Sequence, residues 1–179
     1  HHDLRSVWLT RGRDVSRVRR HDFARRMRIW RKGPPAPRVV DRYARAARVE
    51  RPALQWFSHG PPNGSLVLVP GAHWATKRWL DERWMALGAG WAGPVVVCGG
   101  PSDRARVDAI ARGVGPRAVP LAEDGFDHTF DAMSCASVVV AGDTGLMHLA
   151  GAMAVPLVAL FGPTTSKDGF WCHTGEVVE

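Results

Sequence analysis

The sequence has few cysteines. Three of its 179 residues are cysteine, and no two of them form a C-x-x-C pair: they are Cys98, Cys135 and Cys172. A sparse, odd set argues against a disulfide framework and against a structural zinc site. Because it suits a reducing compartment, we expect the protein to be cytoplasmic.

Long apolar runs are also missing. No run approaches the roughly 18 residues that a transmembrane helix needs, so the sequence predicts no membrane span. The chain begins His1-His2-Asp3 without a methionine and ends in "GEVVE", a pattern typical of a strand. We therefore expect a fragment of a longer protein, with room for one good hydrophobic core.

Lysine is rare, and charge is unevenly distributed. The net charge is +7, yet 16 basic residues oppose 5 acidic ones up to Arg51, whereas 8 oppose 12 from Pro52 onward. Two interpretations of the basic segment stay open: a solvated, arginine-rich surface, or a face turned toward anionic lipid at the inner membrane. Nucleic-acid binding is an alternative from another class. It is disfavoured because no DNA- or RNA-binding motif is present and the excess positive charge lies before the best-formed domain.

The order of predicted elements indicates an α/β domain. Residues 38–50 have helical spacing and end a basic segment, 1–51, and a connection rich in proline and glycine follows over 52–64. Short apolar strands then alternate with helices over 65–179, which predicts a Rossmann-like parallel sheet with helices on both faces. The expected strands are 66–69, 94–100, 117–121, 137–142 and 156–162, and the expected helices are 80–88, 103–112, 126–134 and 145–153.

Three polar loops follow strands of this predicted sheet. They are 70–78, 99–103 and 142–148. In open α/β sheets, ligands bind at the carboxyl ends of the strands, where helix N-termini turn their free N–H groups outward. We therefore expect these loops to form one ligand site.

The loop after the fourth strand carries Asp143, Thr144, Gly145 and His148. Capping of the next helix by Asp143 or Thr144 would explain one polar residue. It would not explain His148, which lies one turn beyond Thr144 on the same helical face. Together with an open helix start, these residues favour a site for an anion over a packed core histidine.

The loop after the first strand supplies positive charge. Lys77 is one of three lysines, and its ammonium can reach a phosphate as a point charge. The alternative is a solvated lysine at a helix start. Because a cation at a helix N-terminus opposes the helix dipole, the position needs an offsetting partner, and a bound diphosphate would supply it.

Two motifs that would indicate other chemistry fail on context. "GAGWAG" at residues 88–93 has the spacing of a dinucleotide fingerprint, but it follows a helix and precedes a strand, which disfavours an NAD oxidoreductase. His1 and His2 have no convergent partners for a metal, and no D-x-D occurs in the chain. A metal-free site that neutralises phosphate with Lys77 and helix N-termini fits better.

Two segments carry a resemblance to a known family. "LVLVPGAHWATKRWLDERW" at 66–84 and "DTGLMHLAGAMAVPLVALFGPT" at 143–164 resemble glycosyltransferase family 9, the ADP-heptose:lipopolysaccharide heptosyltransferases. The resemblance implies the GT-B fold, with residues 1–51 as the end of the N-terminal domain and 65–179 as an incomplete C-terminal nucleotide-sugar-binding domain. It also implies a cytoplasmic enzyme at the inner face of the membrane.

The resemblance further implies an inverting, metal-independent transfer of heptose from an ADP-sugar to an anionic, lipid-linked lipopolysaccharide core acceptor, without a cofactor. Lys77 would contact the diphosphate, with His73 standing where relatives often have a hydroxyl. Asp103 would hold the nucleoside, and the sugar nucleotide would meet Asp143, Thr144 and Gly145, with His148 close by. The family's catalytic aspartate lies near the start of the N-terminal domain, so no residue here takes that role. The alternative is a fragment that binds a nucleotide sugar without activity.

Overall fold

The computed structural model describes residues 38–47, 60–122, 126–163 and 175–178. The chain divides into two units, and helix α3 (Val39–Ala47) belongs to the first. This helix confirms the helical spacing seen in the sequence, and Tyr43 on it is 61% exposed. The domain that carries the predicted loops is the second unit.

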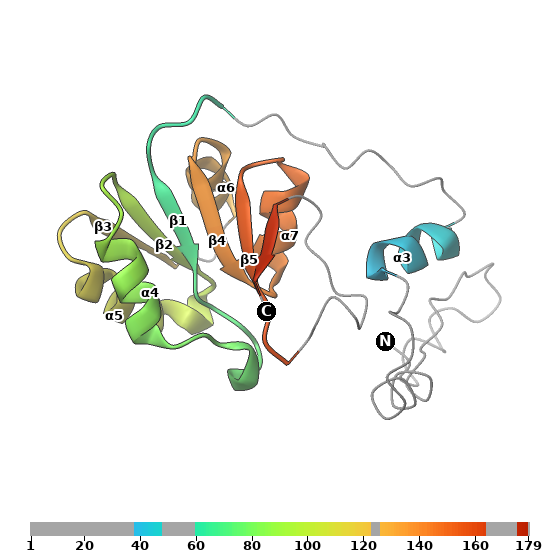
Figure 1. The fold of residues 1–179 in the computed structure, drawn as a ribbon, viewed down its shortest axis with the longest axis horizontal. Coiled ribbons are helices and arrows are strands. Elements are labelled where there is room, and N and C mark those ends of the chain that lie inside the picture. The colour runs from blue at the N-terminus through green and yellow to red at the C-terminus, as the bar shows by residue number, and fades with distance from the viewer. Residues whose placement is uncertain (1–37, 48–59, 123–125, 164–174, 179) are drawn as a thin grey trace. The chain divides into compact units, whose positions relative to one another are not determined.

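The described part of the second unit forms a six-stranded parallel sheet (Figure 1). The strand order is β3-β2-β1-β4-β5-β6. Strands β2 and β3 therefore lie on one side of β1, and β4, β5 and β6 lie on the other. This confirms the predicted α/β class with a doubly wound sheet, whose direction of winding reverses between β1 and β4. The strands are β1 (Leu66–Val69), β2 (Val95–Gly99), β3 (Ala118–Ala122), β4 (Val138–Gly142), β5 (Leu157–Leu160) and β6 (Glu176–Val178).

Helices cover both faces of the sheet, as predicted. Helices α4 (Asp81–Ala89) and α5 (Arg104–Val114) lie on one face, and α6 (Asp127–Ser134) and α7 (Gly145–Ala152) lie on the other (Figure 1). Each helix begins and ends within two residues of its expected range. The structure adds two short 3-10 turns that the sequence pattern did not predict, η1 (Ala75–Lys77) and η2 (Pro101–Asp103).

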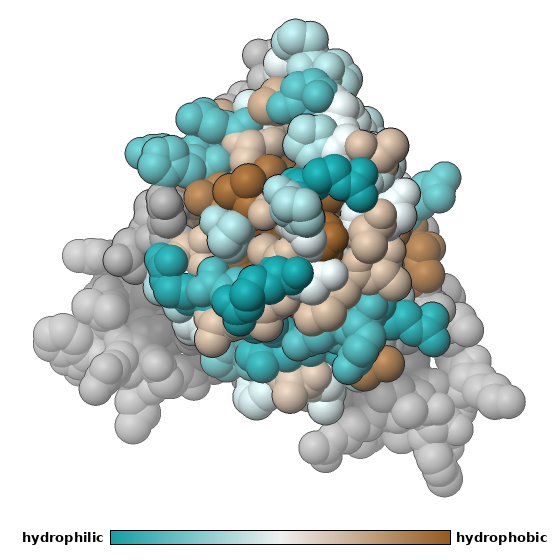
Figure 2. Space-filling view, turned by 90° about the vertical axis from the view of Figure 1, so that its left-hand side faces the viewer, coloured by the Kyte–Doolittle hydropathy of each residue, from teal (hydrophilic) through white to brown (hydrophobic). Residues whose placement is uncertain are grey.

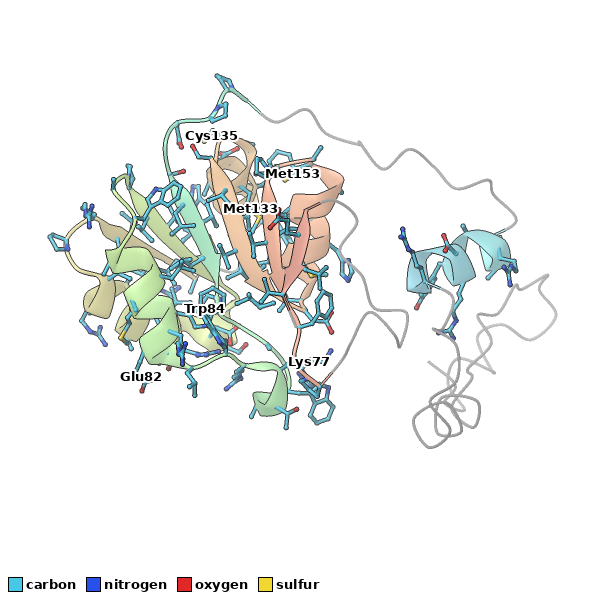
Figure 3. All side chains as sticks on the ribbon, viewed as in Figure 1. Lys77, Glu82, Trp84, Met133, Cys135 and Met153 are labelled. Carbon is cyan, nitrogen blue, oxygen red and sulfur yellow. The ribbon has the colours of Figure 1, made fainter. Side chains whose placement is uncertain are left out.

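Strand β1 is at the centre of both cores. All four of its residues are buried, and alternate side chains point to opposite faces of the sheet. Leu66 and Leu68 join the core that holds Trp84 of α4. Val67 and Val69 join the core that holds Met133 of α6, which lies on the other face (Figure 3). The continuous apolar run in the sequence is therefore explained by burial on both faces.

The edge strand β3 is more exposed. Val119 is 59% exposed, and the neighbouring Pro120 carries no N–H group, so this edge offers one donor fewer to another strand. Figure 2 views the domain from the side of this edge and shows hydrophobic residues near the middle of the face, with hydrophilic residues around them. Within the described ranges, no helix is long and apolar enough to cross a membrane.

The glycines of "GAGWAG" have packing roles. Gly88 lies in α4, where a Cβ atom would come within 2.6 Å of Cγ2 of Val114 on α5. A Cβ atom on Gly93 would lie 2.3 Å from the carbonyl oxygen of Gly64. The segment ends α4 and leads into β2, so the structure confirms the helix-then-strand order that excluded a dinucleotide fingerprint.

Helix α7 ends in a left-handed turn. Ala154 has a φ of 56°, its N–H donates to the carbonyl of Gly151 (3.2 Å), and the N–H of Val155 donates to the carbonyl of Ala150 (3.3 Å). These two bonds form a Schellman motif, in which glycine is the usual residue at the left-handed position. Ala154 therefore holds a conformation that costs an L-residue about 1–2 kcal/mol.

Replacing Ala154 with glycine should stabilise the domain. We expect Ala154→Gly to raise the free energy of unfolding by about 1 kcal/mol, because glycine adopts positive φ without steric cost. Ala152→Gly, inside the last turn of α7, should lower it by roughly 0.5–1 kcal/mol. Denaturant titration of both variants checks the opposite signs, and destabilisation by both would contradict the assignment.

Candidate functional site

A pocket lies at the carboxyl ends of β1, β2 and β4, beside the point where the winding of the sheet reverses. Its volume is about 530 Å³, within the range of small-molecule sites. All three polar loops predicted from the sequence contribute to it. The lining residues are Val69, Gly71, Ala72, His73, Arg78, Gly99, Gly100, Ser102, Asp103, Phe126, Thr144, Gly145 and Leu146.

The start of α7 forms one wall of the pocket. Thr144 is the N-cap, and its Oγ1 accepts a hydrogen bond from the N–H of Met147 (3.4 Å). The sequence did not decide whether Asp143 or Thr144 caps this helix, and the structure shows that Thr144 does. Thr144, Gly145 and Leu146 all line the pocket. Because the first N–H groups of a helix lack acceptors within it, this wall favours negative charge.

Lys77 and Asp143 form an ion pair beside this wall. The distance from Lys77 Nζ to Asp143 Oδ2 is 2.5 Å, and the side chains are 22% and 9% exposed. Lys77 lies at the end of the sheet where the strands have their carboxyl ends, opposite the end that carries Cys135 (Figure 3). The two loops predicted to share a site therefore meet through this pair, although neither residue is among those that line the pocket.

The helix-dipole argument for Lys77 is wrong. Helix α4 begins at Asp81, whereas Lys77 is the last residue of η1, where a cation agrees with the local dipole. Asp143 also supplies the partner that the sequence argument assigned to a diphosphate. The ammonium is thus held at the site by protein charge.

His148 lies next to this ion pair. It is one turn beyond Thr144, and its N–H donates to the Thr144 carbonyl (3.4 Å). Burial lowers the pKa of His148, with Asp143 raising it and Lys77 lowering it further. More than a third of the residue is nevertheless exposed, so solvent screens its charge. His148 is absent from the pocket lining.

Asp103 lies in the pocket at the start of α5. Its carboxylate packs so closely on the first loop that a Cβ atom on Gly71 would be 2.5 Å from Oδ2. A Cβ atom on Gly99 would be 3.0 Å from the Asp103 Cβ atom. Gly71, in the loop after β1, and Gly99, at the end of β2, therefore leave room for the acidic side chain of Asp103.

The pocket is also lined by residues that the sequence analysis did not name, among them Arg78 and Phe126. Arg78 brings a guanidinium to the pocket, and its Nε donates to the carbonyl of Ala72 (2.9 Å). Phe126 lines it with a side chain that is 70% exposed. Arg78 follows Lys77 directly, but arginine is so common in this chain that a single arginine does not indicate a functional residue. His73 lines the pocket as predicted, and its ring meets Trp74 edge to face at 4.9 Å.

The sheet and its pocket define the class of doubly wound α/β proteins that receive a ligand at the carboxyl ends of their strands. Within that class, the family model of glycosyltransferase family 9 (heptosyltransferase) matches residues 19–170. The chain belongs to this family.

Similar proteins agree with this assignment. Lipopolysaccharide heptosyltransferase 1 of Pseudomonas aeruginosa is 33% identical over 135 residues, which are 73% of this chain and 36% of the relative. The E. coli heptosyltransferase WaaC, solved with ADP, has a TM-score of 0.59 at 21% identity, over 76% of this chain and 47% of WaaC. WaaC with ADP-2-deoxy-2-fluoro heptose has a TM-score of 0.57 at 19% identity, over 95% of this chain and 53% of WaaC. These structures confirm the GT-B-type fold, and the chain spans only about a third to a half of its relatives' length.

The charge on His148 should make stability depend on pH. Its pKa is lowered from 6.5 in the folded protein, so the unfolded chain binds a proton more readily, and the free energy of unfolding falls as the pH drops below that value. We expect this fall to be smaller in His148→Gln. Urea titrations of both proteins between about pH 7 and pH 5 check it, and an identical dependence of stability on pH would contradict the lowered pKa of His148.

Proposed function

We propose that this chain is the donor-binding half of an inverting, metal-independent glycosyltransferase that transfers heptose from ADP-heptose to a lipopolysaccharide core acceptor. The observation that carries the proposal is the pocket at the switch point, which combines an open helix start with Arg78 and the adjacent Lys77. Such a site suits a nucleoside diphosphate, because its charge is met by amides from the loop after β4 and by cations from the loop after β1.

The proposed roles follow the position of each residue. Lys77, Arg78 and the amides at the start of α7 meet the diphosphate, with His73 as a further donor. Asp103 accepts hydrogen bonds from the ribose hydroxyls, since it is the carboxylate that lines the pocket. Asp143, Thr144 and Gly145 contact the sugar nucleotide, and His148 lies close to Asp143. The choice of ADP and heptose rests on the ligands named for WaaC.

The proposed reaction is a direct displacement at the anomeric carbon. The acceptor oxygen forms its bond to this carbon as the bond to the diphosphate oxygen breaks, which inverts the configuration. A carboxylate outside this chain takes the acceptor proton, and ADP leaves with the electron pair. Because the leaving group gains negative charge in the transition state, Lys77, Arg78 and the α7 amides lower the barrier electrostatically. As ADP arrives, Lys77 exchanges Asp143 for phosphate oxygens, and Asp143 becomes able to accept from a sugar hydroxyl.

The proposed setting is the cytoplasmic side of the inner membrane, with an anionic lipid-linked acceptor. The basic segment 1–51 would face the lipid, but apart from residues 38–47 it lies outside the described residues. Binding of the chain to anionic liposomes, compared with binding to random oligonucleotides, separates this role from nucleic-acid binding.

ADP should be the nucleoside diphosphate that this pocket prefers. At about 100 times its dissociation constant, a ligand stabilises a protein by about 2.7 kcal/mol, so ADP should raise the melting temperature clearly more than UDP or GDP at equal concentration. The shift should persist in EDTA, because cations of the protein meet the diphosphate. Equal increases in melting temperature with all three nucleotides would contradict a preference for adenine. Loss of the increase in EDTA would show that a metal is required.

Lys77 should be essential for transfer in a protein that contains the complete N-terminal domain. We expect Lys77→Ala to lower turnover at least a hundredfold, because one such charge-stabilising donor is worth about 3–4 kcal/mol. Arg83→Ala, on an exposed turn of α4, serves as the matched control and should retain activity. Turnover of Lys77→Ala near that of the control would exclude Lys77 from the mechanism.

The length of the chain supports an alternative for this chain alone. It spans 36% of one relative and 47% of another, so it would bind the nucleotide sugar without transferring it. ADP binding with no transfer by the isolated chain, and transfer by the longer protein, distinguishes this alternative from a failure of the proposed function.

A further inference from the structure

The geometry points to Arg106 as the residue that positions the proposed donor-binding loop. This residue lies in the first turn of α5, outside the pocket lining, and its side chain is 14% exposed. The loop runs from Pro70 to Trp79 and carries His73, Lys77 and Arg78. Only the expected effect of Arg106 on ligand affinity rests on the proposed function.

Arg106 binds both ends of this loop at once. Its Nη1 donates to the carbonyl of Pro70, which directly follows β1, and its Nη2 donates to the carbonyl of Trp79 (2.7 Å). A single guanidinium thus joins the residue where the loop leaves the sheet to the residue where it approaches α4. The fork of donors in arginine can span two acceptors in a fixed geometry, which the single ammonium of lysine cannot do.

Other contacts hold the guanidinium in place. Nε of Arg106 donates to Asp81 Oδ1 at 2.7 Å, and Nη2 lies 2.5 Å from the same oxygen. Asp81 begins α4, so these contacts of Arg106, which we call the Arg106 clamp, connect the first turns of α4 and α5. The ring of Trp79 also packs edge to face on the buried Trp84, with centroids 5.3 Å apart, which anchors the far end of the loop.

The pocket depends on this arrangement through two contacts. Asp103 lies three residues before Arg106, and its carboxylate packs directly on Gly71, near the loop's beginning. Lys77 reaches Asp143 from the loop's other half. Once its ends are free, the loop can separate from Asp103 and carry Lys77 and Arg78 away from the start of α7. Arg106 is therefore a positioning residue for the cations of the pocket.

Arg117 offers a matched control. It also joins backbone carbonyls with a guanidinium, donating to Ala92 and Ala89, both at 3.1 Å. These carbonyls belong to the last residue of α4 and to the connection from α4 to β2, at the end of the sheet opposite the pocket. Arg106→Met and Arg117→Met both keep an apolar stem and lose a fork of donors to backbone carbonyls, and Arg106→Met also loses the ion pair with Asp81.

The experiment measures amide hydrogen exchange over residues 71–78 and the affinity for ADP in the wild type, Arg106→Met and Arg117→Met. We expect Arg106→Met to accelerate exchange in this segment about tenfold and to weaken ADP binding about tenfold, as for lost hydrogen bonds to a charged group. Arg117→Met should leave both within about twofold, whatever stability it loses. If Arg106→Met does not fold, Arg106→Lys replaces it, with a smaller change in the same direction expected because it restores one donor.

The outcomes separate the two proposals. Unchanged exchange over 71–78, or equal acceleration by the Arg117 variant, would overturn the positioning role. Faster exchange with ADP affinity unchanged would overturn the consequence for the pocket. If the wild type binds no ADP but Arg106→Met still accelerates the segment selectively, the clamp stands and the proposed function fails.

Discussion

The parallel alignment of β1 with its neighbours is the constraint on which the site depends. Leu66 pairs with Val95 of β2 and with Val138 of β4, so these three strands end at nearly the same level. Parallel strands place their carboxyl ends, and the loops that follow, at one edge of the sheet. Loops that are more than 60 residues apart in the chain therefore share a pocket, and Lys77 and Asp143, at sequence separation 66, come into contact.

Charged side chains at and beside the pocket have contacts that offset part of the cost of their partial burial. A lysine with a side chain 22% exposed and an aspartate with one 9% exposed would each be costly without a partner, and their contact offsets part of this cost. The carboxylate of Asp103 is accommodated by the absence of side chains at Gly71 and Gly99. Arg78 and the start of α7 then bring positive potential to the same space. The affinity for anions proposed for this site thus comes from several elements, each held by its own local contacts.

Much of the fold could be predicted from the sequence because its patterns are local. Apolar runs such as Leu66–Val69, bounded by glycine and proline, gave the strands, and the alternation of strands with helices gave the parallel sheet. The three loops of the pocket followed from the rule for strand ends. The partner of Lys77 and the involvement of Arg78 and Phe126 could not be predicted, because they depend on the packing of distant segments. Ala154 was missed because alanine carries no mark of a left-handed turn.

The ion pair of the resting site also bears on how salt would act on it. A ligand that takes Lys77 from Asp143 would replace one charge contact of this lysine with another, so the number of ion pairs made by Lys77 would be conserved. Dissolved ions weaken the contact that is lost as well as the contact that is gained. The contribution of Lys77 to the proposed affinity for an anion would therefore depend less on ionic strength than that of an ammonium in open solvent.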